Sequence, residues 1–320
     1  MRAGFLVIDK PPGITSHDVV AMARATTGVE KVGHTGTLDP FATGVLPLAL
    51  GPATRLIQYL DEDLKVYEAT IALGAATDTG DPTGQIIRES PVPELTVEQV
   101  EAALATFKGI RMQAPPRHSA VKVRGRPLYA YARAGEDVTA AARPIRIDSV
   151  RLESLAEREL VVRITCGRGT YARVLADEIA VALGTTGHLS ALRRAQSGIF
   201  TLDGALDLPG LSRIVAERDD WPAVLRPSRG AERVAWRPRD TVRAELAGWM
   251  VSPEVALSHI PAVELQADEA RRMQTGGPPP PPPRDLPVGG RYRLQFQGLL
   301  IALATREAGQ VRIDVRMGGL

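Results

Sequence analysis

A single carboxylate, Asp39, lies within a run of glycines and small residues that spans positions 33–46. Glycines near a polar side chain permit backbone angles that other residues rarely adopt, and they let a ligand approach the chain closely. A carboxylate in such a loop can act as a nucleophile or as a charged partner for a reacting carbon. Taken alone, the Asp39-Pro40 step also fits an ordinary surface turn followed by a buried strand over residues 45–50.

Other catalytic chemistries lack their sequence patterns. Residues 33–36 do not continue into the Gly-Lys-Ser/Thr ending of a phosphate-binding loop, and neither Ser16 nor Ser119 lies in a nucleophile elbow. The five histidines are not spaced as metal ligands, and Cys166 is the single cysteine. We therefore expect no metal site and no cofactor.

Length and composition predict a globular protein of the cytoplasm. The 320 residues, of which 44% are hydrophobic, are enough for a sizeable core and about two domains. The sequence has no run of the ~18 apolar residues that a membrane-spanning helix needs. The apolar stretch near Met1 is too short for a signal peptide, and a lone cysteine fits a reducing compartment. We expect no contact with membranes.

A basic stretch occupies residues 108–133, which contain no Asp or Glu. Such a patch neutralises phosphates, and Tyr129 and Tyr131 within it could stack on unpaired bases. Prolines at 115–116 and Gly125 indicate an extended loop or a short hairpin rather than a helix. A solvated loop would carry the same residues, so the stretch alone does not establish nucleic-acid binding. Its cations are Lys108, Arg111, Arg117, Lys122, Arg124, Arg126 and Arg133.

Hydrophobic patterning predicts helices and strands that do not alternate regularly, which favours an α+β fold with a mainly antiparallel sheet. The sequence pattern changes near residue 250, and short strands are predicted after that point. The prolines at 278–283 are typical of a polyproline II spacer or an exposed loop. The predicted strands are residues 5–8, 45–50, 65–73, 145–153, 159–166, 291–296, 299–304 and 311–315, and the predicted helices are residues 15–27, 53–60, 96–107 and 171–183.

Several of these segments resemble the TruB family of pseudouridine synthases. Residues 36–46 match its GxLDPxAxGxL pattern, in which the aspartate is the nucleophile. Residues 10–16 resemble its KPxGxTS motif, which packs beside the catalytic loop, and residues 65–69 resemble a strand with an active-site tyrosine. Residues 169–173 match its GTYxR motif, and residues 188–198 resemble the segment whose leucine lines the uracil pocket.

The resemblance implies a role for individual residues. Asp39 would be the nucleophile, Tyr67 an active-site tyrosine and Arg173 the partner of Asp39. An arginine near the first turn of a helix opposes the helix dipole, and a carboxylate held by two bonds from its planar guanidinium would explain it. The implied substrate-binding residues are Lys10, His34, Tyr67, Tyr171 and Leu192, and we assign Lys122, Arg124 and Arg126 to the RNA backbone.

The implied reaction converts the uridine at position 55, in the T loop of tRNA, to pseudouridine. The N1–C1′ bond breaks, the base rotates, and C5 joins C1′. Because no atom is added and no electron is transferred, the reaction needs no metal, nicotinamide or nucleotide. The base must leave its stack, at a cost of roughly a few kcal/mol. The sequence leaves open whether Asp39 attacks C1′ or C6.

The resemblance also implies two domains. Residues 1–250 would form the catalytic domain, with an RNA-gripping insert at about 108–135, and residues 251–320 a PUA-like RNA-binding domain. We expect a monomer that acts on the T stem-loop of tRNA without an obligate protein partner. Two alternatives stay open: a non-catalytic protein that binds or folds tRNA, and the guide-RNA-dependent branch of the same superfamily. Catalytic motifs that start near Met1, and the basic insert, favour the stand-alone enzyme.

Overall fold

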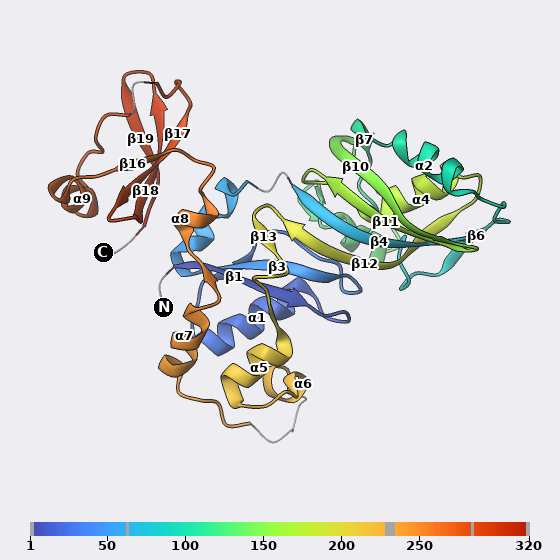
Figure 1. Ribbon diagram of the computed structural model, residues 1–320, viewed down its shortest axis with the longest axis horizontal. Coiled ribbons are helices and arrows are strands. Elements are labelled where there is room, and N and C mark those ends of the chain that lie inside the picture. Colours follow the sequence, from blue (N-terminus) through green and yellow to red (C-terminus); the bar gives the residue numbers. More distant parts are fainter. Residues whose placement is uncertain (1–2, 62–63, 228–233, 283–284, 318–320) are drawn as a thin grey trace.

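The computed structural model describes residues 3–61, 64–227, 234–282 and 285–317. Within these ranges, eleven strands form one sheet, and its central order is β14-β1-β3-β12-β4-β11-β10-β7 (Figure 1). The strands are β1 (Gly4–Lys10), β2 (Val32–His34), β3 (Thr43–Leu50), β4 (Lys65–Leu73), β7 (Gly109–Gln113), β10 (Arg143–Ala156), β11 (Glu159–Cys166), β12 (Gly187–Ser197), β13 (Phe200–Thr201), β14 (Leu206–Asp207) and β15 (Met250–Val251).

Most neighbouring strands of this sheet are antiparallel, which confirms the predicted α+β fold. The pairs β1–β14 and β3–β12 are parallel. The second of these pairs brings Arg194 beside Gly44, whose φ is +101°. A Cβ atom at Gly44 would lie 2.3 Å from the carbonyl oxygen of Arg194. Only glycine therefore lets the two strands meet directly after the Asp39 loop.

Helices cover the two halves of the sheet separately (Figure 1). The helices of the described residues are α1 (Ser16–Thr27), α2 (Val97–Ala105), α3 (Leu128–Arg133), α4 (Ala172–Ala182), α5 (Leu208–Ala216), α6 (Trp221–Leu225), α7 (Arg239–Ala247), α8 (Pro253–Ala256) and α9 (Ala267–Gln274), of which α9 packs on strands of the C-terminal region. Helices α2 and α4 pack on β10, β4 and β12, whereas α1, α5 and α7 pack near β1 and β2. The predicted helix at 53–60 is the 3-10 helix η1 (Gly51–Tyr59).

The C-terminal region is β-rich, as expected. Strands β16 (Ala262–Glu264), β17 (Arg291–Phe296), β18 (Leu299–Glu307) and β19 (Gln310–Arg316) form a second sheet in that order. The three strands predicted from the sequence are present, whereas β16 and α9 were not predicted. Leu300 and Leu303 of β18 share a buried cluster with Phe5 and Val7 of β1, so the two sheets pack together. Residues 278–282 form neither helix nor strand, and Pro283 lies outside the described residues.

The basic stretch contains more regular structure than its prolines and glycine indicate. A short hairpin is present, formed by β8 (Lys122–Val123) and β9 (Arg126–Pro127), but α3 follows it directly, so the expectation of no helix is wrong. Tyr131 explains this helix, because the residue is only 9% exposed and its hydroxyl donates to the carbonyl oxygen of Val123 at 3.0 Å. Arg126 covers the ring of Tyr131 at 4.5 Å. Tyr131 is therefore a packing residue and is not free to stack on a base.

The remaining paired strands, β5 (Ala75–Thr77) and β6 (Ile86–Glu89), form a hairpin beyond the end of β4. The loop at its tip, residues 78–85, turns back toward α4 and forms part of the site described below. In the part of the chain that the structure describes, no helix is long and apolar enough to cross a membrane.

Candidate active site

Lys10, the last residue of β1, fixes the backbone of the loop that carries Asp39. The Lys10 side chain is fully buried, and its Nζ donates to the carbonyl oxygens of Pro11, Ile14 and Pro40. Burial lowers the pKa of this ammonium to about 8, while the charge of Asp39 opposes the shift. Lys10 was predicted to bind substrate, but a fully buried side chain cannot reach one. The structure shows instead that Lys10 holds the backbone next to Asp39.

A second buried cation, Arg194 of β12, holds the other part of the same loop. Its guanidinium donates to the carbonyl oxygens of Gly36, Thr37 and Val45 at 3.1, 3.3 and 2.8 Å. A carbonyl deprived of such a bond in a buried site costs about 1–3 kcal/mol. The backbone on both sides of Asp39 is therefore rigidly placed. Sequence reasoning did not single out Arg194, because a pair of adjacent arginines gives no sign that one of them is buried.

Asp39 faces Arg173 in the first turn of α4. Arg173 Nε lies 2.9 Å from Asp39 Oδ2, and Nη2 donates to Oδ1 at 3.3 Å. The Arg173 side chain is 5% exposed, whereas that of Asp39 is 33% exposed. The ion pair predicted from the sequence is thus present. Two bonds fix the plane of the carboxylate and leave part of it accessible to a ligand.

Arg173 also ties Asp39 to two other loops. Its Nη1 donates to the carbonyl oxygen of Thr79 at 2.9 Å, and its Nη2 donates to that of His118 at 3.0 Å. Asp81 lies 3.8 Å from Nη1. Every nitrogen of the guanidinium therefore has an acceptor, which is what a charged group with almost no exposure requires.

Asp81 is a site residue that sequence reasoning missed. Its carboxylate accepts hydrogen bonds from the hydroxyls of Thr79 and Thr83 and from the backbone of Thr83, so it holds its own loop together. The available signal was an Asp-Pro step in a turn rich in Thr and Gly, which is the same kind of sequence that surrounds Asp39.

Asp39 lines a cavity of about 520 Å³. Four residues predicted from the sequence line it together with Asp39: Tyr67, Tyr171, Arg173 and Leu192. These side chains come from β4, the start of α4, and β12, which the fold brings to one place. The volume is in the range of ordinary small-molecule sites.

Tyr171 is held in the cavity wall by its backbone. Gln113, at the end of β7, accepts a hydrogen bond from the Tyr171 N–H at 2.8 Å and donates to the Tyr171 carbonyl oxygen at 3.3 Å. Gln113 is itself buried. Sequence reasoning did not single out Gln113, because it lies within the basic stretch, shortly before its proline pair, with no motif around it.

The charges around Asp39 act in opposite directions on its pKa. Burial raises the pKa of the carboxyl above its ordinary value, Arg173 and Lys10 lower it, and the negative charge of Asp81 raises it further. Burial also raises the pKa of the Tyr67 phenol, and Arg194 opposes this shift. The phenol is therefore neutral at physiological pH, whereas Asp39 has a charged partner that favours its ionised form.

The structure does not bring His34 into the cavity wall. This residue ends β2, and burial together with the charge of Arg194 lowers the pKa of its ring. Its Nδ1 atom is buried, with no hydrogen-bond partner among the described residues. The predicted contact between His34 and substrate stays a prediction.

The three residues assigned to the RNA backbone differ in their surroundings. Lys122 and Arg124 are exposed at the turn of the β8–β9 hairpin. Arg126 instead pairs with Glu136 at 2.7 Å, and Arg117 lies 3.5 Å from Asp137. The expectation of a patch without counter-charges is thus corrected, because acidic residues just beyond the stretch fold back onto it.

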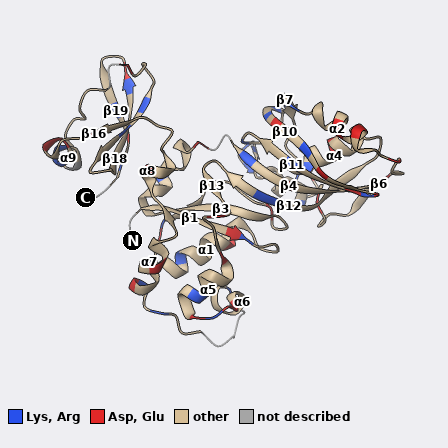
Figure 2. Ribbon diagram, viewed as in Figure 1, with Lys and Arg blue, Asp and Glu red and all other residues tan. Residues whose placement is uncertain are grey.

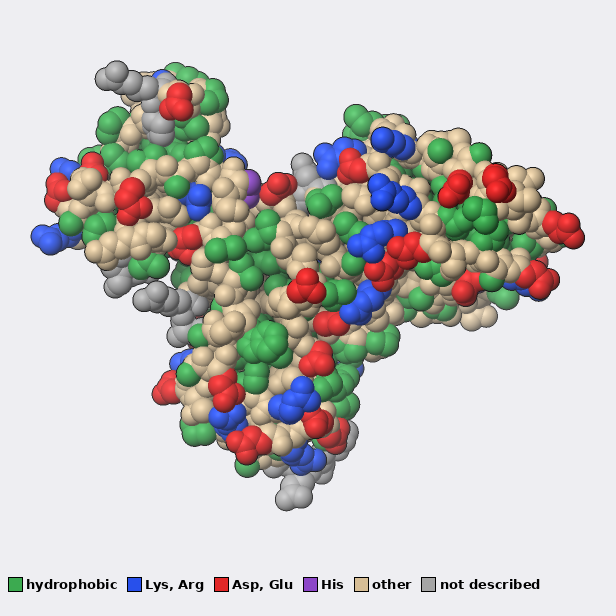
Figure 3. All heavy atoms as spheres, in the orientation of Figure 1, with side chains coloured by type: hydrophobic (Ala, Val, Ile, Leu, Met, Phe, Trp, Pro, Cys, Tyr) green, Lys and Arg blue, Asp and Glu red, His purple; other side chains and the backbone are tan. Residues whose placement is uncertain are grey.

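A row of arginines crosses the face of the sheet opposite α4. Arg151, Arg163 and Arg193 lie in register on β10, β11 and β12, with Glu68 of β4 between the last two. Figure 2 shows charged residues on these neighbouring strands, and Figure 3 shows blue and red side chains along this part of the surface. Arg163 contacts Glu68 at 2.9 Å and Arg193 contacts Asp9 at 2.7 Å, so the row is partly neutralised. Because its members come from separate strands, no sequence pattern indicates it.

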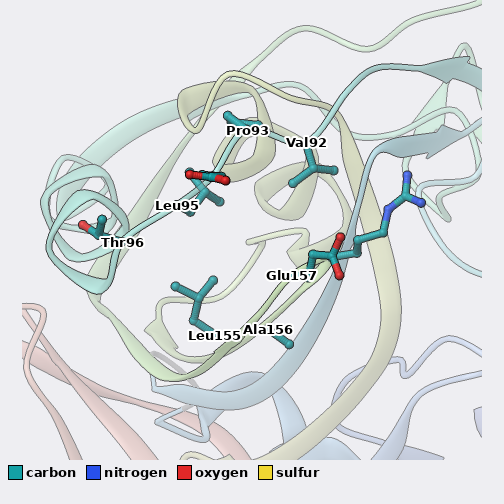
Figure 4. Close-up of a pocket in the computed structure, with 9 residues that line it drawn as sticks. Val92, Pro93, Leu95, Thr96, Leu155, Ala156 and Glu157 are labelled. Carbon is teal, nitrogen blue, oxygen red and sulfur yellow. The ribbon is translucent and has the colours of Figure 1, made fainter.

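A second cavity, of about 740 Å³, lies at the far end of the sheet, between residues 92–96 and the β10–β11 turn (Figure 4). Leu95 and Leu155 face each other across it. None of the residues predicted for the site lines this cavity. Among the described residues, no group of three His, Cys, Asp or Glu side chains is placed to hold a metal ion.

Sequence comparisons agree with the resemblance. Residues 24–172 match the family model described as TruB family pseudouridylate synthase (N terminal domain). The chain is 41% identical over 319 residues to tRNA pseudouridine synthase B of Geobacter sulfurreducens, covering 98% of this chain and 96% of that protein. It is 37% identical over 281 residues to tRNA pseudouridine synthase B of Streptococcus thermophilus, covering 86% and 87%.

Solved structures show the same fold. A chain of a Cbf5-Nop10-Gar1 complex superimposes with a TM-score of 0.67 at 25% identity, covering 99% of this chain and 87% of that chain. A chain of an H/ACA RNP bound to a substrate RNA containing 2′-deoxyuridine gives a TM-score of 0.65 at 23% identity, covering 99% and 85%. The whole described chain, including its C-terminal sheet, thus follows one known arrangement.

Proposed function

The chain belongs to the TruB family of pseudouridine synthases, and from this premise we propose that it isomerises the T-loop uridine 55 of tRNA with Asp39 as nucleophile. The observation that carries the proposal is the partly exposed Asp39 carboxylate, oriented by Arg173 in a cavity that Tyr67 and Leu192 also line. Relatives named tRNA pseudouridine synthase B, similar over nearly the whole chain, support tRNA as the substrate.

Each side chain has a definite task in this reaction. The ionised Asp39 attacks the nucleoside, the N1–C1′ bond breaks, and the base turns so that C5 bonds to C1′. The C5 proton leaves, N1 gains a proton, and the carboxylate is released unchanged. Arg173 keeps the carboxylate ionised before the attack and fixes its orientation, while the neutral Tyr67 ring and Leu192 pack against the base.

The direct test is tritium release from tRNA labelled at uracil C5, followed by mapping of the modified position. We expect release from wild-type tRNA and none from a transcript whose T-loop uridine is replaced by cytidine. Absence of release from the wild-type transcript, or pseudouridine at a different position, would contradict the proposal.

We further propose that residues 1–250 form the catalytic domain and residues 251–320 a PUA-like domain that binds RNA, and that the protein acts as a monomer without an obligate protein partner. The separate four-stranded sheet β16–β19, with its own buried cluster around Tyr292 and Leu294, supports the second domain. Alignment with a tRNA pseudouridine synthase B over 98% of the chain favours the stand-alone enzyme over the guide-RNA-dependent branch.

Activity should fall at acid pH with an apparent pKa above the ordinary 3.8 of an aspartate, because burial raises the pKa of Asp39 and the protonated acid is not nucleophilic. Since the negative charge of Asp81 contributes to this rise, Asp81→Asn should move the acid limb to lower pH. The pH dependence of single-turnover rates measures both effects.

A matched control is Asp78→Asn, because Asp78 lies in the same loop but accepts its bond from Gln85. Its acid limb should coincide with that of the wild type. An acid limb that stays in place in Asp81→Asn would show that Asp81 does not influence the titration of Asp39.

The exposed hairpin cations should supply affinity for tRNA and no chemistry. Replacing Lys122 and Arg124 together by Ala should raise KM and leave turnover at saturating tRNA nearly unchanged. The log–log salt slope should fall by roughly 0.7–0.9 for each phosphate that the variant no longer neutralises. The salt dependence of tRNA binding measures this. Arg126→Ala should change the slope less, because Glu136 already neutralises Arg126.

Arg218→Ala, an exposed arginine beyond α5, provides the control for a general reduction of positive charge. An unchanged slope in the Lys122/Arg124 double variant would place the electrostatic contacts elsewhere, and the Arg151–Arg163–Arg193 row would be the next surface to test.

A further inference from the structure

Ser119 has an unsatisfied hydroxyl in the wall of the Asp39 cavity. The residue is 5% exposed, and its Oγ has no hydrogen-bond partner among the described residues. It lines the same cavity as Asp39, Tyr67 and Leu192. A buried hydroxyl without a hydrogen-bond partner is unfavourable. A serine with such a hydroxyl in the wall of a ligand cavity can therefore form a hydrogen bond with the ligand.

The backbone on both sides of this hydroxyl is fixed. Arg173, the partner of Asp39, donates to the carbonyl oxygen of His118, and the N–H of Tyr129 in α3 donates to the carbonyl oxygen of Ser119 at 3.0 Å. One guanidinium therefore sets the position of both the Asp39 carboxylate and the Ser119 loop. A group held in this way can recognise a ligand with little further loss of conformational entropy.

We propose that the Ser119 hydroxyl hydrogen-bonds the polar edge of the pyrimidine base in the cavity, and so helps the enzyme to distinguish uracil. This inference rests on the proposed function and assigns a specificity residue to it. Uracil presents two carbonyl oxygens and one N–H along that edge, and a serine hydroxyl can donate to the former or accept from the latter. The side chain of Leu192 can contact the face of a base but has no polar atom that could recognise this edge.

The principal test compares Ser119→Ala with the wild type on tRNA labelled with tritium at C5 of the target base. We expect kcat/KM for uridine to fall about tenfold, the effect of one neutral hydrogen bond of roughly 1.4 kcal/mol. Target bases carrying 2-thiouridine, 4-thiouridine or 3-methyluridine remove one edge group at a time. The wild type should discriminate against at least one of them, and Ser119→Ala should lose that discrimination because the hydroxyl that reads the group is absent.

Stability separates this role from a structural one. Removing a hydroxyl that has no partner should leave the melting temperature of Ser119→Ala unchanged or higher. The matched control is Ser212→Ala in α5, because Ser212 is also buried and its Oγ also lacks a partner among the described residues, but it lies outside the cavity. Ser212→Ala should show a similar melting temperature and wild-type kinetics.

Wild-type kcat/KM in Ser119→Ala would overturn the inference. So would a lower melting temperature with unchanged discrimination among the three analogues, because the hydroxyl would then support the fold and not the base. A wild-type protein that releases no tritium from uridine would instead contradict the proposed function itself. The two failures are therefore distinguishable.

Discussion

Asp39→Asn should abolish pseudouridine formation while the protein stays folded and binds tRNA nearly as the wild type does. An amide has the shape of the carboxylate but neither its charge nor its nucleophilicity. We expect tritium release below about 1% of the wild-type rate, which corresponds to at least ~2.7 kcal/mol in the activation barrier. Release above that level would contradict Asp39 as the nucleophile.

The loop should keep its conformation in this variant, because Lys10 and Arg194 hold its backbone without using the Asp39 side chain. Circular dichroism and tRNA binding check this point. The matched control is Asp9→Asn: Asp9 also pairs with an arginine, Arg193, at 2.7 Å, but it does not line the cavity. Asp9→Asn should retain most of the activity.

Arg173→Lys should remain folded and lose at least tenfold in turnover, equivalent to ~1.4 kcal/mol or more. A lysine keeps the positive charge, but a single ammonium cannot bond both oxygens of Asp39 and also reach the carbonyl oxygens of Thr79 and His118. The decrease should appear in kcat more than in KM, because the carboxylate would be misoriented and not removed. Single-turnover rates at saturating tRNA measure this decrease.

Arg88→Lys is the corresponding control, since Arg88 pairs with Asp177 at 2.8 Å on an exposed surface of the molecule. Its activity should match that of the wild type, because exposed pairs contribute little. If Arg173→Lys were equally active, the two-bond geometry at Asp39 would be unimportant for catalysis, and the positive charge alone would explain the pair.

Helices and strands could be predicted from the sequence where the pattern of neighbouring residues is sufficient to form them. Residues 65–73, 159–166 and 291–296 alternate or cluster their apolar side chains as strands do, and the structure has strands there. The helix at 128–133 was missed because it is held by the burial of Leu128 and Tyr131, not by its own sequence, which lies next to a glycine and a proline.

Within the site, the sequence identified residues through short patterns and could not assign their surroundings. Lys10 was expected at the substrate but is buried under the loop, and His34 is absent from the cavity wall. Arg126 was expected to be free, but Glu136 neutralises it. In each case the exposure or the charge partner of the side chain depends on elements from elsewhere in the chain, and a short sequence pattern does not contain that information.

The sequence by itself determined which side chains could carry the chemistry, because Asp39, Tyr67 and Arg173 each lie in a motif that neighbouring residues define. The family resemblance also implied that Arg173 pairs with Asp39, 134 positions away. The tertiary structure alone decided that Asp81 and Ser119 join the same cavity. The physical reason is that a motif consists of residues close together in the sequence, whereas the burial, charge pairing and pKa of a side chain depend on groups that folding brings together from distant parts of the chain.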